Sequence, residues 1–472
     1  MKKLSILFIL IIVTAIMQAQ ERKQPLAGKP PVVNIKKPLN FTLTNGLKVM
    51  VVENHKLPKV TFNLTIDNPP FLEGNKKGVD ELCSSLIGNG STKISKEDFN
   101  EEVDFMGASI SFSSNSAYAS SLSKFSKRTL ELLAYGALDP KFTQEELDKE
   151  KAKSIEGLRS QEKSVSSIAN RVVNALAYGK NHPSGEFTTE ETIASITLED
   201  VINNYKKRFV PQNAYLAIVG DVKYNEIKPI IEELFGSWQK TTVNAISYPD
   251  PKNTEVTEIN FIDVPNAVQS EISVVNTYNL KMNDKDFFPA VIANYILGGG
   301  FNSYLNMNLR EAHGWTYGAS TSIGAGKYVT SVRSSSAVKN NVTDSAVVEF
   351  IKEIKRIRTE KVTTEALENA KAGYIGRFVM KAEKPESVAR YALNTETENL
   401  PADFYENYIK NVNAVTKEDV MAAANKYFLI DNSRIVIVGK GKEVLPGLEK
   451  LNIPIFYFDK YGNPVEKPVF KQ

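Results

Sequence analysis

Residues 143–169, TQEELDKEKAKSIEGLRSQEKSVSSIA, recur without a gap as residues 363–389, TTEALENAKAGYIGRFVMKAEKPESVA. The apolar run 214–220, AYLAIVG, recurs in the same way as residues 433–439, SRIVIVG. The two pairs follow one another in the same order, so the sequence predicts two tandem homologous domains. In the first pair, identical residues align at Thr143, Glu145, Leu147, Lys151, Ala152, Ser167 and Ala169 of the first copy.

The duplication sets the predicted domain boundaries. We expect an N-terminal domain over residues 39–245 and a C-terminal domain over residues 258–452, joined by a polar stretch that contains prolines. Residues 21–38 are predicted to be an N-terminal arm. Residues 453–472 have prolines at 454, 464 and 468 and are predicted to be an irregular C-terminal tail.

Residue patterns within each domain indicate a mixture of strands and helices. Asn45-Gly46 is a strong hairpin dipeptide. Residues 60–66 alternate apolar and polar side chains, which predicts a half-buried strand. Apolar residues at i, i+3, i+4 and i+7 from Val79 predict an amphipathic helix over residues 78–88. Strands and helices joined partly by hairpins favour an α+β fold, with mainly antiparallel sheets packed against helices.

Overall composition excludes several classes of protein. The 472 residues are 42% hydrophobic and 24% charged, which is typical of a globular protein. A formal net charge of +3 gives no electrostatic basis for binding nucleic acid. The single cysteine cannot form an internal disulfide, and three histidines leave little scope for histidine-rich metal chemistry.

The N-terminus has the pattern of a secretory signal peptide. Lys2-Lys3 precedes an apolar run from Leu4 to Met17, and cleavage is expected after about residue 20. No later stretch reaches the length of a membrane span, so no membrane insertion is expected once residues 1–20 are removed. We therefore expect an exported, periplasmic protein. The alternative is an uncleaved N-terminal anchor.

One segment of the second half carries a family resemblance. Residues 297–319, LGGGFNSYLNMNLREAHGWTYGA, follow a tandem α+β duplication and resemble the LRE-x-x-G-x-x-Y pattern of the M16 zinc peptidases. This family includes insulin-degrading enzyme, pitrilysin and the mitochondrial processing peptidase. The chain is most similar to the smaller bacterial members, which have two such domains and pair to enclose a chamber. Arg310 and Tyr317 match the pattern's arginine and tyrosine.

The resemblance also implies a zinc site that this chain lacks. Active members have His-x-x-Glu-His on the first helix, which supplies two zinc ligands and a general base. The matching positions here are Glu81, Ser84 and Ser85, and the family's third ligand falls on Gly157. We therefore expect no metal or other cofactor in this chain. The three histidines are far apart in the sequence and are interpreted as structural or surface residues: His55, His182 and His313.

The resemblance implies a role for the two residues that remain. In the family, the arginine and tyrosine act at the zinc site, where they hydrogen-bond substrate carbonyls and stabilise the oxyanion. The alternative is that Arg310 forms an ordinary ion pair with Glu311 or Glu365, and that Tyr317 lies in the core.

Three functional hypotheses follow. The first is a non-zinc subunit of a heterodimeric M16-type peptidase, whose partner has an intact His-x-x-Glu-His and supplies the zinc, with peptides as substrates that add as a strand to a sheet edge. The second is a catalytically inert protein with the same fold that serves in assembly or peptide binding. The third, an autonomous hydrolase, has no Ser-His-Asp or Cys-His arrangement in the sequence to support it.

Overall fold

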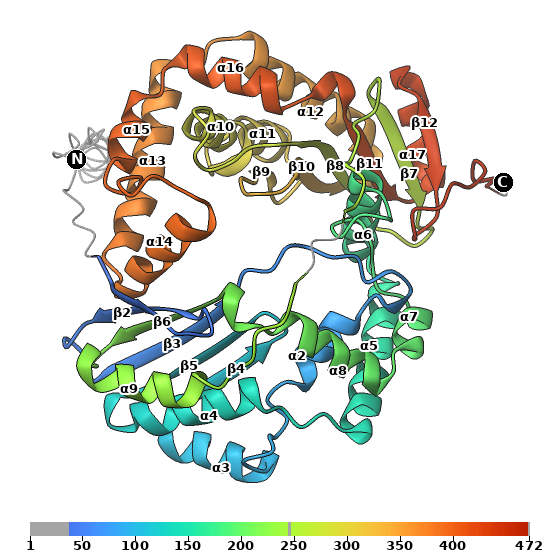
Figure 1. Ribbon diagram of the computed structural model, residues 1–472. Coiled ribbons are helices and arrows are strands. Elements are labelled where there is room, and N and C mark those ends of the chain that lie inside the picture. The colour runs from blue at the N-terminus through green and yellow to red at the C-terminus, as the bar shows by residue number, and fades with distance from the viewer. Residues whose placement is uncertain (1–36, 244–246, 471–472) are drawn as a thin grey trace, which may run out of the picture. The chain divides into compact units, whose positions relative to one another are not determined.

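Two six-stranded sheets form the framework of the protein (Figure 1). A computed structural model describes residues 37–243 and 247–470. Residues 1–20, which we interpret as a signal peptide, lie outside these ranges. Within the described ranges, no helix is long and apolar enough to cross a membrane.

The first sheet has the strand order β1-β2-β6-β3-β5-β4. All neighbours are antiparallel except β2 and β6, which are parallel. The predicted hairpin joins β1 to β2, and Gly46 supplies the positive φ of +91° that its turn requires. The strands are β1 (Leu39–Thr42), β2 (Lys48–Glu53), β3 (Lys59–Ile66), β4 (Ser109–Ser113), β5 (Ser116–Leu122) and β6 (Ala214–Gly220).

The second sheet repeats this order as β12-β7-β11-β8-β10-β9. Strands β6 and β11 hold the same place in their sheets, as the repeated AYLAIVG and SRIVIVG runs predict. The α+β prediction with mainly antiparallel sheets is confirmed. The strands are β7 (Glu258–Asp263), β8 (Gln269–Tyr278), β9 (Ala319–Ile323), β10 (Thr330–Lys339), β11 (Arg434–Gly439) and β12 (Ile455–Phe458).

The sixth strand of each sheet differs between the halves. In the first sheet it is β1, antiparallel to β2, whereas in the second it is β12, parallel to β7. The expectation of an irregular tail is therefore wrong for Ile455–Phe458. Pro454 does not prevent the pairing, because it is the carbonyl of Pro454 that accepts a hydrogen bond, from the Ile259 amide at 2.8 Å.

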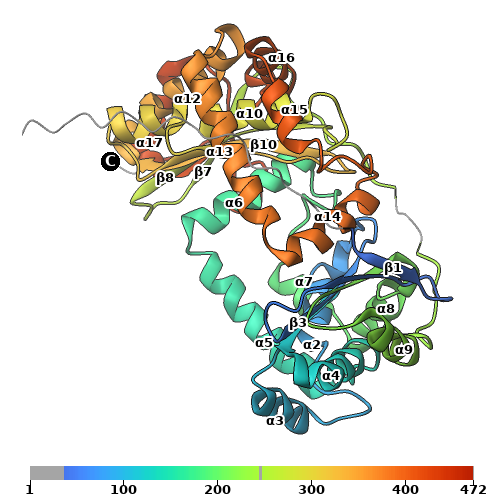
Figure 2. The ribbon, with the colours of Figure 1, turned by 90° about the vertical axis from the view of Figure 1, so that its left-hand side faces the viewer.

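Helices α4 and α9 of the first half cover one face of its sheet (Figures 1 and 2). The main core lies there, where β3 contributes fully buried Val60, Phe62 and Leu64. The helices are α2 (Val79–Leu86), α3 (Lys96–Met106), α4 (Ser126–Leu138), α5 (Gln144–Gln161), α6 (Val165–Tyr178), α7 (Glu190–Ser195), α8 (Leu198–Arg208) and α9 (Tyr224–Phe235).

Helices of the second half include two short π-helical segments, η4 (Tyr295–Gly299) and η5 (Met307–Ala312). Long helix α12 packs on β8 and β10. The α-helices are α10 (Phe287–Asn294), α11 (Tyr304–Asn306), α12 (Thr343–Thr359), α13 (Thr364–Ala382), α14 (Pro385–Thr397), α15 (Tyr408–Ala414), α16 (Lys417–Tyr427) and α17 (Gly441–Leu448).

Two equivalent helices are exchanged between the halves. Helix α6 packs on β8 and β11 of the second sheet, where Ile168 and Val172 meet Val436. Helix α14 packs on β2 and β6 of the first sheet, where Ala389 meets Val219. The duplicated segment thus places each copy of this helix on the other copy's sheet, within one compact unit.

This exchange predicts that the two halves unfold together. Replacing Ile168, which is 2% exposed, by Ala removes apolar contacts from the second sheet and should cost about 2–5 kcal/mol of unfolding free energy. Differential scanning calorimetry should show a single transition at a lower Tm. The control Met380→Ala, at a position 64% exposed, should leave Tm nearly unchanged. Two separated transitions, only one of them shifted, would contradict the coupling.

Candidate functional site

Helix α2 lies where the family's zinc helix is expected. Its apolar stripe is buried as predicted and consists of Val79, Leu82, Cys83 and Leu86. Glu81 and Ser85 are exposed on the opposite side. Gly78 precedes the helix at φ +105°, and a side chain there would lie 2.6 Å from Ile193 Cδ1. The helix therefore forms as predicted, and two of the expected ligand positions, Glu81 and Ser85, face outward.

The two serines of α2 make hydrogen bonds to backbone. Ser84 Oγ donates to the carbonyl of Asp80 at 2.9 Å and accepts from the amide of Ser114 at 2.9 Å. Ser85 Oγ donates to the carbonyl of Glu81 at 3.2 Å. At the position of the family's general base, the Ser84 hydroxyl thus links α2 to the turn between β4 and β5.

Asp80, next to the first ligand position, is also engaged by neighbouring elements. Its carboxylate accepts hydrogen bonds from Ser114 Oγ at 2.6 Å and from Asn204 Nδ2 at 3.0 Å. The first donor lies in the β4–β5 turn and the second on α8. Asp80 therefore joins α2 to two other elements and does not stand in for a missing ligand.

The third ligand position lies on α5, which packs beside α2. Gly157 occupies it, and a Cβ built there would have no atom within 4 Å. The neighbouring Glu156 is exposed. Across residues 37–243 and 247–470, no group of three His, Cys, Asp or Glu side chains is arranged to hold a metal ion. Helices α2 and α5, on which the resemblance places the zinc ligands, therefore lie side by side.

We predict that the chain binds no stoichiometric zinc, because Ser84, Ser85 and Gly157 offer no zinc ligand. Elemental analysis of the purified protein should find far less than one zinc per chain. The combined variant Glu81→His, Ser84→Glu, Ser85→His and Gly157→Glu should gain zinc, since Gly157 has room for a side chain beside α2. About one zinc per native chain would contradict the prediction.

The structure brings together three residues that the sequence did not connect. His55 Nδ1 lies 2.6 Å from Asp221 Oδ1, and Ser123 Oγ donates to Asp221 Oδ2 at 2.8 Å. These hydrogen bonds lower the pKa of the Asp221 carboxyl, the one from His55 most. A nucleophilic serine needs histidine between serine and aspartate, and here aspartate is in the middle. The cluster does not support an autonomous hydrolase.

The other candidate side chains for independent chemistry are packed against neighbours. His182 lies against Tyr178 and Tyr248, and its burial lowers the pKa of its ring. His313 stacks on Trp315 with ring centroids 4.0 Å apart. Burial raises the pKa of the Cys83 thiol to about 12, so this thiol stays protonated and unreactive at neutral pH.

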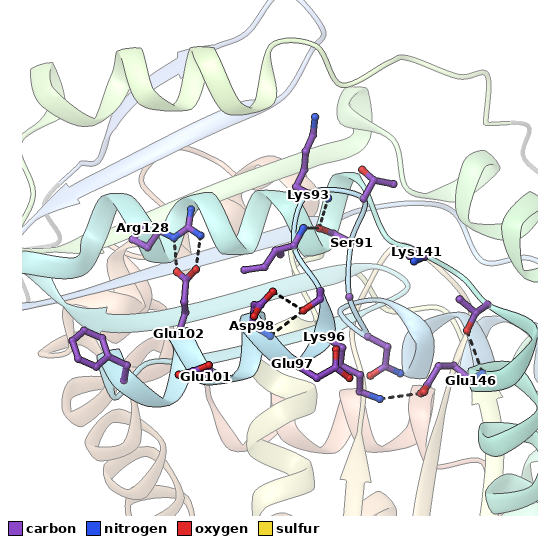
Figure 3. A pocket seen from close by; sticks show the side chains of 17 residues that line it. Ser91, Lys93, Lys96, Glu97, Asp98, Glu101, Glu102, Arg128, Lys141 and Glu146 are labelled. Carbon is purple, nitrogen blue, oxygen red and sulfur yellow. Dashed lines mark hydrogen bonds and ion pairs between the residues drawn. The ribbon is translucent and has the colours of Figure 1, made fainter.

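A large surface cavity of about 860 Å³ lies beside α3 (Figure 3), and neither Glu81 nor Ser85 lines it. Its lining holds side chains of both charges, some of them paired. Arg128 bonds Glu102 at 2.6 Å, and Lys96 bonds Glu146 at 2.9 Å. Five acidic and four basic side chains line the cavity, so it has no dominant charge with which to select a ligand.

Arg310 and Tyr317 lie on or beside the π-helical segment η5. Gly314, at φ +63°, follows this segment, and its amide donates to the Arg310 carbonyl at 3.0 Å. The Arg310 guanidinium lies 4.9 Å from the centre of the Phe301 ring, and its Nε is 3.5 Å from Glu311 Oε1. Its side chain is 37% exposed. The sequence predicted neither the π-helix nor the stacking on Phe301.

Tyr317 is 94% exposed, in the loop that leads to β9. The alternative that Tyr317 lies in the core is therefore wrong. The ion pair of Arg310 with Glu311 does form, but at the surface, where such pairs contribute under about 1 kcal/mol. Tyr317 is thus open to solvent, and Arg310 is partly so.

Comparison with known proteins agrees with this architecture. The family model described as insulinase (peptidase family M16) matches residues 48–189, and the model described as peptidase M16 inactive domain matches residues 195–374. Together they span more than half of the chain. The protein belongs to the M16 peptidase family.

Two bacterial relatives match most of the chain. The Bacillus subtilis protein YmxG, named an uncharacterized zinc protease, is 22% identical over 85% of this chain and 98% of its own length. The Helicobacter pylori protein YmxG, named a non-peptidase homolog, is 20% identical over 84% of this chain and 94% of its own.

Two solved structures share the fold. The peptidase M16 inactive domain from Pseudomonas fluorescens has a TM-score of 0.76 and 22% identity, covering 85% of this chain and 98% of that one. The periplasmic protease PqqL from Escherichia coli has a TM-score of 0.68 and 16% identity, covering 92% of this chain and 51% of that one.

Proposed function

We propose that this chain is the non-zinc subunit of an exported, heterodimeric M16-type peptidase. One contrast carries the proposal. The zinc positions are occupied by Glu81, Ser84, Ser85 and Gly157, whereas Arg310 and Tyr317 present a guanidinium and a phenol to solvent. Two polar side chains open to solvent, at the positions that the resemblance assigns to substrate contacts, are available to a bound peptide.

In this proposal the two subunits divide the reaction. The partner, a chain with intact His-x-x-Glu-His, holds zinc and activates the water that attacks the peptide carbonyl. This chain supplies Arg310 and Tyr317 to the oxygen of that carbonyl. A permanently charged guanidinium and a phenolic O–H donor both suit the negative charge that develops there.

Peptides are the proposed substrates, and sheet edges could receive them. Among the described strands, β4 and β9 lie at one edge of their sheets and β1 and β12 at the other. Strand β9 begins at Ala319, two residues after Tyr317. A peptide that adds to this edge as a further strand would bring its backbone carbonyls near the tyrosine.

Export is the part of the proposal that rests on residues 1–20. Lys2-Lys3 and the run from Leu4 to Met17 support it, and a structural neighbour, PqqL, is named a periplasmic protease. We predict that the mature protein from a periplasmic fraction begins near residue 20 or 21 on N-terminal sequencing. A cytosolic protein that begins at Met1 would contradict this prediction.

The central test is an activity that needs both subunits. The tagged full chain is used to capture an M16-type partner with intact His-x-x-Glu-His, and the mixture is assayed on an internally quenched peptide selected from a random library. Neither chain alone should cleave it. Arg310→Ala or Tyr317→Phe should lower kcat by about 10²–10³-fold, the usual effect of removing an oxyanion donor.

The matched control is Arg128→Ala. Arg128 is also 37% exposed and also pairs with glutamates, but it lies on α4, outside the proposed site. This variant should keep kcat nearly unchanged, and both arginine variants should still form the heterodimer in size-exclusion chromatography.

The second candidate is a catalytically inert protein for assembly or peptide binding. The name of the Helicobacter pylori relative as a non-peptidase homolog favours it. If the Arg310→Ala variant keeps full activity in a stable heterodimer, the arginine takes no part in the reaction. The assembly or peptide-binding role would then be preferred.

A further inference from the structure

We propose that Asn306 is the positioning residue that holds Arg310 and Tyr317 in one arrangement. The catalytic part of this inference rests on the proposed function. Asn306 ends the short helix α11, is 6% exposed, and lies four residues before Arg310, about one helical turn. Nothing in the sequence pattern marks it, because its role depends on contacts between separate loops.

The side-chain amide of Asn306 connects the loop that contains Phe301 to the loop that contains Tyr317. Its Nδ2 donates to the carbonyl of Phe301 at 2.8 Å, and its Oδ1 accepts from the amide of Ala319 at 3.3 Å. Phe301 is the residue on whose ring the Arg310 guanidinium stacks. Ala319 is two residues after Tyr317. The buried Asn306 side chain thus bonds both to Phe301, which contacts Arg310, and to Ala319, at the end of the loop that contains Tyr317.

On the arginine side, the contacts form a closed ring. The guanidinium rests on the Phe301 ring, the Phe301 carbonyl is bound by Asn306, and Asn306 is joined to Arg310 through a turn of helix. Phe301 is itself 66% exposed, so packing alone does not fix its place. The bond from Asn306 holds its carbonyl, next to Gly300, whose amide bonds the Tyr295 carbonyl at 3.0 Å.

On the tyrosine side, hydrogen bonds hold the loop on both sides of the exposed Tyr317. The Gly318 amide donates to Thr316 Oγ1 at 3.1 Å, and Ser336 Oγ lies 2.9 Å from both Thr316 Oγ1 and the Gly318 carbonyl. These bonds shape the loop and tie it to β10. The bond from the Ala319 amide to Asn306 ties it to the helix that leads to Arg310.

An amide is the group that both contacts require. The Phe301 carbonyl needs a donor and the Ala319 amide needs an acceptor, and asparagine offers both within one short side chain. Aspartate keeps the acceptor only. Leucine has similar bulk and keeps neither, so it separates the loss of the hydrogen bonds from the loss of packing.

The first readout is hydrogen exchange in the isolated full chain, which needs no partner. In Asn306→Leu, the amide of Ala319 should exchange at least about tenfold faster, as its hydrogen bond is lost. In Asn306→Asp, which retains the acceptor, it should exchange nearly as in the native chain. Unchanged protection of Ala319 in Asn306→Leu would overturn the inference.

The second readout is the activity of the heterodimer on the library-derived peptide. Asn306→Leu should lower kcat by up to about 10²-fold, the scale of a misplacement of about 1 Å, with KM changed much less. Normal kcat in this variant, alongside a large loss in Arg310→Ala, would also overturn the inference. Full activity in Arg310→Ala would instead overturn the proposed function, while the exchange measurement still decides what Asn306 holds.

The control is Asn340→Leu. Asn340 is 7% exposed and its Nδ2 donates to the Ala267 carbonyl at 2.9 Å, so it matches Asn306 in burial and bonding. It lies outside the proposed site. This variant should lower Tm but leave both the exchange of the Ala319 amide and kcat near their native values. A kcat loss equal to that of Asn306→Leu would show an effect of stability alone and overturn the inference.

Discussion

The packing of α6 on β8 and β11, and of α14 on β2 and β6, is the contact on which the remaining structure depends. Each sheet has one face covered by helices of its own half and gains cover on the other from its neighbour's helix. Burial of apolar surface is the main favourable term in folding, and here part of it is shared by the two halves. The halves that the duplication defines in sequence are therefore not separate units in stability.

Much of this fold could be predicted from local patterns. The hairpin at Asn45-Gly46, the buried stripe of α2 and the equivalence of β6 and β11 depend on residues close together in the chain. The exchanged helices and β12 could not be predicted in this way. An apolar stripe shows that a helix packs on something, but not on which sheet, and Pro454 obscures the short strand that follows it.

The candidate site likewise has a part that the sequence predicts and a part that it does not. The sequence alone shows that Ser84, Ser85 and Gly157, at positions where the resemblance expects the zinc motif, are not among the usual zinc ligands. The environment of Arg310 cannot be predicted in this way, because stacking on Phe301 and the amide contacts of Asn306 join loops that only the folded chain brings together. The cluster of His55, Asp221 and Ser123 shows the converse, since three suggestive residues meet in an order that has no nucleophilic function.

The π-helical form of η5 has a consequence for how this surface can change over evolution. A π-turn holds one residue more than an α-turn, as the bond from the His313 amide to the Asn308 carbonyl reflects. Because the π-turn takes up one extra residue, deleting one residue from Met307–Ala312 can close the segment to a regular α-helix and leave the residues beyond it near their present direction. A related chain that is one residue shorter here can thus keep its arginine on the same face of the helix, so a change of spacing in this segment does not by itself mean a lost site.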